Sequence, residues 1–133
     1  MSETQLLRCL QKDLQNFFDD LIESFPTEGD LVIARHLVGN QLPMSDVMDY
    51  ILKVLLPLKE KVDNRDNNFF LENNILFEAL DNRKVNHFKN IWKSENLTDE
   101  DRECIWKWFD RFLMLAERYQ KCKRRDQQIK IQT

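Results

Sequence analysis

The chain has 133 residues, with only 2 glycines and 3 prolines beside 9 phenylalanines and 3 tryptophans. Two glycines cannot supply the left-handed turns of a many-stranded sandwich or a glycine-rich phosphate loop. Most all-β folds and the Rossmann and P-loop nucleotide folds are therefore disfavoured. With 42% apolar and 32% charged residues, the chain has enough apolar side chains for a core, so we expect one domain built from helices.

The net charge of −3 is unevenly distributed along the chain. Residues 118–133 carry six basic side chains and one acidic side chain, a net charge of +5. Residues 1–117 carry 14 basic and 22 acidic side chains, a net charge of −8. The sequence therefore predicts an acidic body with a basic tail, and the two are separate surfaces.

The first predicted element is an amphipathic helix over residues 4–25. Its apolar side chains recur every three or four residues on one face. They are Leu7, Leu10, Leu14, Phe17, Phe18, Leu21 and Phe25. Pro26 ends this helix, and a short second helix follows, with Thr27 and Asp30 spaced as a capping box and Gly39-Asn40 suited to its C-terminus. Its expected apolar set is Leu31, Ile33, Ala34, Leu37 and Val38.

The segment from Ser45 to Val62 is apolar on nearly all sides, which is typical of a central helix packed against several neighbours. Ser45 is a suitable N-cap, because a serine side chain accepts a hydrogen bond from the first turn. Pro57 should kink this helix or restart it as a second piece. A polar connector at residues 63–68 then leads to two or three short helices between residues 69 and 92.

The last predicted helix begins at Thr98, an N-cap residue followed by three acidic residues at 99–101 that suit the positive end of a helix. Apolar residues between 105 and 119 form one stripe. Trp106 and Leu113 lie about 110° from the centre of that stripe and widen the apolar arc to about half the helix.

These elements predict an all-α fold, a single compact bundle of about six helices with a central apolar helix and a long C-terminal helix. We expect a helical domain at residues 1–125 and a frayed or disordered basic end at residues 126–133. No run of about 18 apolar residues is present, so we expect no membrane partner. The odd set of cysteines, without a C-x-x-C pair, favours reduced thiols and an intracellular location. They are Cys9, Cys104 and Cys122.

We predict no enzyme activity, cofactor or metal, because the sequence has no catalytic or metal motif with diagnostic spacing. His36 and His87 lie in separate helices without a ligand three or four residues on, and are interpreted as surface or satisfied histidines. A Cys104–His87 dyad is an alternative that only the fold can test. The acids at 99–101 suit either the helix dipole or a divalent ion. Residues 63–74 lack the glycine and glutamate of a calcium loop.

Two surfaces are candidates for binding a partner. Trp106 is either a peripheral core residue or an exposed anchor, and we hypothesise that it forms a protein-binding or self-association surface with Leu113. The second surface is a basic patch, whose members are Arg118, Lys121, Lys123, Arg124 and Arg125. Three interpretations of the patch stay open: cations that complement the helix dipole, a nuclear-import signal, and a nucleic-acid contact.

A series of apolar anchors runs through the chain. They are Phe17-Phe18, Phe25-Pro26, Asp30-Leu31, Pro57, Phe69-Phe70, Phe88, Ile91-Trp92, Ile105-Trp106 and Tyr119. Their order resembles that of small all-helical proteins of unassigned function encoded by nucleocytoplasmic large DNA viruses. The resemblance implies a virus-encoded protein in the host cytoplasm or nucleus, and it supplies no active-site residues.

The sequence therefore leads to two expectations about function. The first is a non-enzymatic, virus-encoded helical protein that binds a host or viral protein, with a homodimer as one form of that interaction. The alternative is a nucleic-acid-associated or nuclear-targeted factor that uses the basic C-terminal segment.

Overall fold

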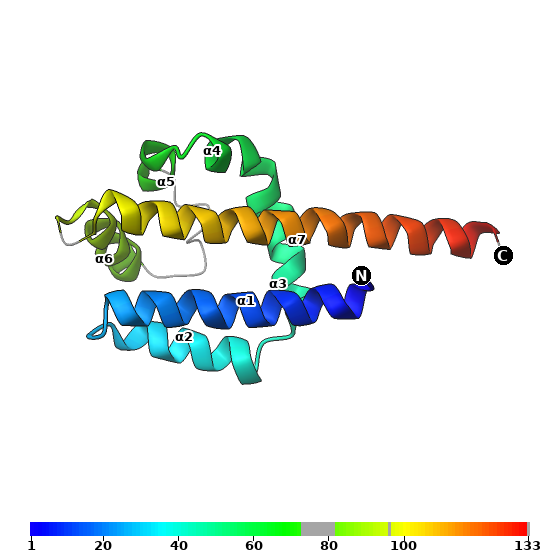
Figure 1. The fold of residues 1–133 in the computed structure, drawn as a ribbon, viewed down its shortest axis with the longest axis horizontal. Coiled ribbons are helices and arrows are strands. Elements are labelled where there is room, and N and C mark those ends of the chain that lie inside the picture. The colour runs from blue at the N-terminus through cyan, green and yellow to red at the C-terminus, as the bar shows by residue number, and fades with distance from the viewer. Residues whose placement is uncertain (73–81, 96, 133) are drawn as a thin grey trace.

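The computed structural model describes residues 1–72, 82–95 and 97–132, and within these ranges it contains helices and no strand (Figure 1). In chain order the elements are α1 (Glu3–Ser24), α2 (Gly29–Asn40), α3 (Met44–Tyr50), the π-helical turn η1 (Ile51–Leu55), the 3-10 turn η2 (Leu56–Leu58), α4 (Lys59–Asp63), α5 (Asn67–Glu72), α6 (Asn82–Lys93) and α7 (Asp99–Gln132). The all-α prediction is confirmed. The apolar residues predicted to be helical between Ile75 and Leu80 lie outside the described ranges.

Two long helices, α1 and α7, form the frame of the molecule. They lie side by side and run antiparallel (Figure 1). The indole nitrogen of Trp108 donates to Asp20 Oδ2 at 2.9 Å, across 88 positions of sequence. The Cys122 thiol donates to the Met1 carbonyl at 3.6 Å, across 121 positions. The helix α2 folds back along α1, and the α3–η1 segment packs against both long helices.

The core lies where α1, α7 and the α3–η1 segment meet. Its most completely buried side chains are Leu6, Leu10, Met48, Val62 and Leu113. At the α1–α7 contact, Phe17 meets Phe112 edge-on with 5.6 Å between ring centroids. Burying one such aliphatic side chain stabilises the fold by about 1.5–3 kcal/mol, so this three-way contact is the main force that holds the long helices together.

The ends of the two long helices are fixed by local hydrogen bonds. At the start of α1, the Ser2 hydroxyl accepts from the Gln5 amide at 3.2 Å, and the Gln5 side chain accepts from the Ser2 amide at 2.9 Å. This capping box places the start slightly before the predicted residue 4. As predicted, α1 stops just before Pro26 and Thr98 caps α7.

The predicted caps of the two middle helices are wrong. The helix α2 begins at Gly29 after Glu28, and Thr27 makes no capping hydrogen bond. The helix α3 begins at Met44 after Pro43, which places Ser45 inside the first turn. Turn geometry overrides the capping signals: the Glu28 amide donates to the Phe25 carbonyl, and the Pro43 carbonyl accepts from the Asp46 and Val47 amides of α3.

Gly39 does not form the predicted left-handed helix end. It lies inside α2, and neither glycine has a positive φ. A Cβ at this position would come within 2.9 Å of the Gln15 side-chain nitrogen on α1, so only the end of a flexible side chain would have to move. The Gln11 side chain donates to the Val38 and Gly39 carbonyls at 3.2 Å each. These hydrogen bonds, and not a left-handed glycine, link the end of α2 to α1.

The predicted central helix is broken at Pro57, as expected for a proline inside a helix. The chain passes from α3 through η1 and η2 before α4 begins at Lys59. Only one side of this segment is buried, at Met48, Ile51, Leu55 and Val62. The expectation of burial on nearly all sides is wrong, since Tyr50 is 43% exposed. The same holds for Ile33 of α2, which is 60% exposed.

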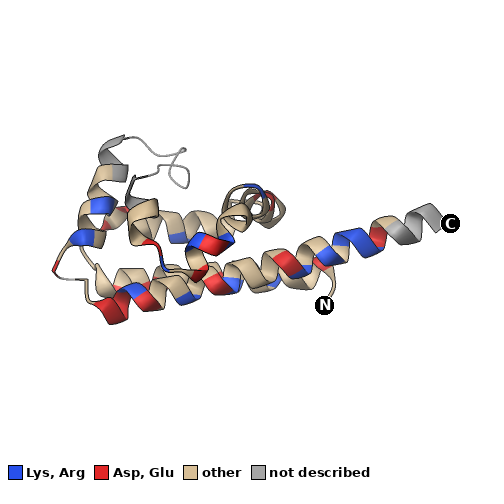
Figure 2. Ribbon diagram, turned by 90° about the horizontal axis from the view of Figure 1, so that it is seen from above, with Lys and Arg blue, Asp and Glu red and all other residues tan. Residues whose placement is uncertain are grey.

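The helix α7 is longer than predicted. It runs to Gln132, so the expected loss of helical structure after Arg125 is not observed. Figure 1 shows the end of α7 extending past the N-terminus and away from the other helices. The acidic residues at its start and the basic residues near its end lie far apart along one straight axis (Figure 2).

Candidate interaction surface

Four basic side chains near the end of α7 lie on one outward face. They are Arg118, Lys121, Arg124 and Arg125, and all four are exposed. At 100° per residue they fall within an arc of about 120°, and at 1.5 Å per residue they cover about 10 Å of the helix axis. We call these four residues the basic stripe; in Figure 2 the Lys and Arg residues near the end of α7, Lys123 included, are blue.

No side chain of the body neutralises the basic stripe in the part of the chain that the structure describes. The ion pairs of that part leave all four members without an acidic partner. Asp126 follows Arg125 directly but lies off the arc, about 80° from Arg118 around the helix. Glu117 lies on the arc, directly before Arg118, but none of these ion pairs joins it to the stripe. The stripe therefore presents four unpaired cations to solvent, with one acidic side chain on the same face.

Lys123 belongs to the predicted patch by sequence but not to this face. Its Nζ lies 5.0 Å from the centroid of the Tyr119 ring and 4.0 Å from Asp49 Oδ1 on α3. Tyr119 and, more weakly, Asp49 raise the pKa of Lys123 above its ordinary value. Lys123 thus lies on the side of α7 that faces α3, and the structure divides the five predicted residues into the four members of the basic stripe and one half-exposed cation on another face.

The hypothesis of an exposed Trp106–Leu113 surface is corrected by their positions. Each side chain is only 2% exposed. Trp106 packs edge-on against Trp92, with 5.7 Å between ring centroids, and against Phe109 at 5.8 Å. The physical reason is that α7 is covered by α1 on one side and by η1 and α4 on the other, so both edges of its apolar arc are buried. The alternative that placed Trp106 in the core fits the structure.

Arg65 is a site residue that the sequence did not single out. It ends α4 in the left-handed region, with φ of 52°. The Arg65 amide donates to the Val62 carbonyl and the Asp66 amide to the Lys61 carbonyl, the pattern of a Schellman motif with arginine where glycine is usual. The sequence of a polar connector predicts a left-handed helix end only when glycine or asparagine follows the C-cap residue. Here arginine occupies that position.

The Arg65 side chain binds two acidic residues in the first half of α7. Its guanidinium donates to both carboxylate oxygens of Asp110, at 2.9 and 2.7 Å, and to Glu103 at 3.1 Å. These contacts, the hydrogen bond to Asp110 first, raise the pKa of Arg65. The guanidinium also lies 6.0 Å from the Trp106 ring. Arg65 therefore links α4 to α7, and its positive charge is paired with the carboxylates of Asp110 and Glu103.

A second charged contact fastens α1 to α7. Arg111 donates to both carboxylate oxygens of Asp13, with distances of 3.0 to 3.1 Å. Asp13 is 6% exposed, whereas the side chain of Arg111 is 54% exposed. The carboxylate is therefore buried and depends on this one arginine, while the arginine keeps much of its contact with water.

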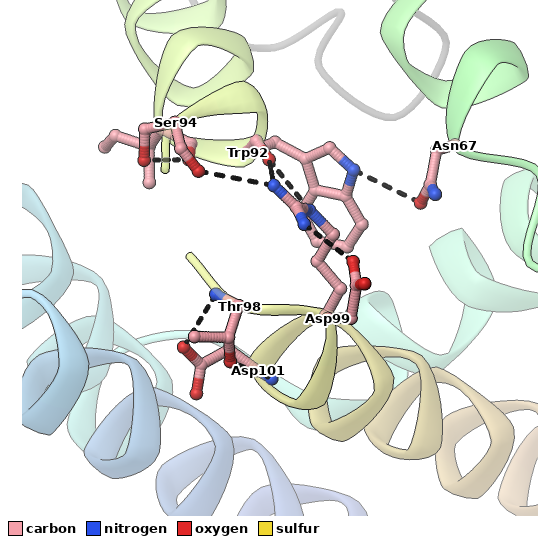
Figure 3. A network of polar contacts seen from close by, with 8 residues as sticks. Asn67, Trp92, Ser94, Thr98, Asp99 and Asp101 are labelled. Carbon is pink, nitrogen blue, oxygen red and sulfur yellow. Dashed lines mark hydrogen bonds and ion pairs between the residues drawn. The ribbon is translucent and has the colours of Figure 1, made fainter. Parts of the chain in front are cut away.

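The acids at the start of α7 have structural partners (Figure 3). The Asp101 carboxylate accepts from the Thr98 amide at 3.1 Å, and the Thr98 hydroxyl accepts from the Asp101 amide at 3.1 Å. Asp99 accepts from Arg102 at 3.1 Å, and Arg102 also donates to the Trp92 and Ser94 carbonyls. These contacts support the helix-start interpretation of residues 99–101. Among the described residues no group of three or more His, Cys, Asp or Glu side chains is placed to hold a metal ion.

The predicted histidine sites are separate from one another. His36 is exposed, and its Nδ1 lies 3.2 Å from the Asn40 side-chain nitrogen. The Nε2 atom of His87 lies 2.8 and 2.9 Å from the two carboxylate oxygens of Glu28. This pair stands at the edge of a hollow of about 460 Å³ between the α1–α2 turn and α6. Cys104 is exposed on α7, and all three cysteines are free thiols.

The comparisons with known proteins add no family to this description. No protein-family model, curated protein or solved structure matches the chain. The described helices also include none whose length and apolar character would allow it to cross a lipid bilayer.

Proposed function

We propose that the protein is a non-enzymatic interaction protein that binds a negatively charged partner through the basic stripe. The observation that supports this proposal is that some basic side chains on and beside α7 form ion pairs, whereas those of the basic stripe do not. Arg65, Arg102 and Arg111 each bind acidic groups of the fold, whereas the four cations of the stripe bind none of the described acids. A partner can therefore bind these unpaired cations without breaking an ion pair of the fold.

The size of the electrostatic effect restricts the kind of partner. An exposed ion pair with a carboxylate contributes roughly 0–1 kcal/mol, so four of them contribute at most about 4 kcal/mol. Association itself costs about 4–15 kcal/mol in lost freedom of motion. Scattered carboxylates on a folded protein therefore give little net binding here. A partner with closely spaced negative charges and condensed counterions meets the requirement better, because releasing the counterions favours binding.

A homodimer formed by pairing two stripes is disfavoured, because it would place like charges opposite each other. The viral origin, the host or viral protein partner and the intracellular location stay predictions from the sequence. A nuclear-import role for residues 121–125 also stays a prediction, and in that case the stripe would bind acidic residues of an import receptor.

The proposal is tested with two double variants of equal charge change. Lys121→Gln/Arg125→Gln removes two cations of the stripe, and Lys93→Gln/Lys107→Gln removes two exposed cations at the other end of the molecule. We expect the wild type and the control variant to elute from immobilised heparin, a sulfated polymer, at the same salt concentration. The stripe variant should elute at a lower one. Equal elution of both variants would contradict a role for the stripe.

A further inference from the structure

The end of α7 carries exposed cations, extends past the other helices and has no aromatic residue after Tyr119. We infer that the basic stripe binds the phosphate backbone of a nucleic-acid duplex, without reading its sequence. This inference rests on the proposed function and names the partner of the same surface.

The end of α7 has a shape that suits the groove of a duplex. Beyond Lys123, which lies beside Asp49, the helix continues to Gln132 past the body of the protein (Figure 1). A single α-helix with side chains is about 10–12 Å across, and the major groove of a DNA duplex is about 12 Å wide. The part of α7 that carries Arg124 and Arg125 can therefore enter such a groove, while Arg118 and Lys121 lie beside the body on the same outward face.

The cations are spread around the helix so that they can reach both strands of a duplex. Arg118 and Arg124 lie about 120° apart around the axis, with Lys121 and Arg125 between them. A helix lying in a groove has a phosphate strand on each side. The two edges of the stripe can therefore reach opposite strands, and the long side chains of Lys121 and Arg125 can bend away from the base edges to phosphate oxygens of the nearer strand.

Most of the negative charge on α7 lies far from the stripe. The acidic start of α7 at Asp99 is 19 residues from Arg118, which corresponds to about 28 Å along the axis. Because charges further apart than about 8 Å are largely screened at physiological salt, these acids do not cancel the stripe, whereas Glu117 and Asp126, each next to a member of the stripe, reduce its local charge from +4 to +2. The net charge of −3 therefore understates the attraction that the stripe exerts on a polyanion (Figure 2).

The side chains at the end of α7 suit a duplex better than a single strand. Proteins that bind single strands without sequence preference stack bases on aromatic side chains. Residues 120–133 contain no aromatic residue, and Tyr119 is 3% exposed. The stripe therefore offers charges to phosphates and no platform for bases.

The test measures binding of the full chain to a fluorescent 16-base-pair DNA duplex of mixed sequence by anisotropy, between 50 and 200 mM salt. Four phosphate contacts predict a log–log salt slope of about −3.6, which is an affinity loss of about 150-fold over this range. Lys121→Gln/Arg125→Gln should reduce the slope to about −1.8, or a loss of about 12-fold. Lys93→Gln/Lys107→Gln should leave the slope of the wild type unchanged. A second duplex of different sequence should bind equally well.

Two further probes, heparin and poly-glutamate, separate the inference from the proposed function. Binding to either of them without binding to the duplex would overturn the inference and leave the proposed function standing. No binding to any of the three would overturn both. Tighter binding to a single-stranded oligonucleotide than to the duplex, or equal slopes for the wild type and the stripe variant, would also overturn the inference.

Discussion

The two halves of α7 belong to one continuous helix but have different surroundings. In its first half the helix is packed against α1, η1 and α4, and its side chains at Glu103, Asp110 and Arg111 bind Arg65 and Asp13. Near its end Lys123 and Cys122 still contact α3 and the N-terminus, but the four cations of the basic stripe lie in solvent, and beyond Lys123 the helix extends past the other helices. The difference shows that position in the fold, and not helix formation or charge content, decides which side chains hold the structure and which are free for a partner.

The largest difference in stability should be that between replacing a buried and an exposed side chain of α7 with alanine. Trp106→Ala removes an indole that is 2% exposed and should destabilise the fold by about 3–5 kcal/mol, because it leaves a cavity beside Trp92. Arg118→Ala removes an exposed side chain and should change stability by less than about 0.5 kcal/mol. Chemical denaturation of both variants measures this. Similar stabilities would mean that Trp106 is not a core residue in solution.

A second contrast lies inside the Asp13–Arg111 pair. Arg111→Ala leaves a buried carboxylate without a donor and should cost about 1–3 kcal/mol. Asp13→Ala leaves an arginine that is already half in water, so the cost should be smaller, about 1 kcal/mol. Denaturation midpoints of the two single variants test the order. The reverse order would show that the arginine, and not the carboxylate, depends on this contact.

A smaller effect should distinguish two replacements of Arg65. Arg65→Ala and Arg65→Gly both remove the guanidinium and its bonds to Asp110 and Glu103. Only the alanine variant keeps a Cβ at φ of 52°, so it should be less stable than the glycine variant by about 1 kcal/mol. Equal stabilities would indicate that α4 ends differently in solution. Neither variant should alter binding at the basic stripe.

The smallest effect should come from the exposed Lys59–Asp63 pair on α4, whose charges are 3.0 Å apart. The hydrogen bond to Asp63 raises the pKa of Lys59 above its ordinary value of 10.5. The pair therefore stabilises the fold fully below pH 10.5, and its contribution is lost as the pH rises through the higher pKa of the folded state. The stability difference between the wild type and Lys59→Gln should shrink between pH 9 and strongly alkaline pH. A difference that stays constant would contradict this.

The sequence predicted the features that depend on local signals. The all-α class, the end of α1 before Pro26, the cap at Thr98 and the break at Pro57 follow from side-chain periodicity or backbone chemistry of a few neighbouring residues. The start of α2 was missed because the Glu28 amide donates to the Phe25 carbonyl, so that Pro26 and Thr27 lie in a turn before the helix. The spacing of a capping box does not reveal this turn.

The candidate site was only partly predictable for the same reason. The basic patch was visible as charge in the sequence, but the inward position of Lys123 depends on Asp49 of another helix. The burial of Trp106 and Leu113 could not be read from α7 alone, since the angular width of an apolar arc does not say how many neighbours cover it. Arg65 was missed because its left-handed backbone belongs to a position that usually holds glycine.

The pairing of α1 with α7 also has a consequence for biosynthesis. Leu6, Leu10 and Leu14 of α1 share the core with Phe112, Leu115 and Tyr119 of α7, about a hundred residues further along the chain. At about 5–20 residues per second, a ribosome needs roughly 5–20 s to make the residues between them. During this time the apolar face of α1 has no α7 to cover it. This core therefore forms only after α7 has been made, and until then the nascent chain exposes an apolar segment that chaperones can shield.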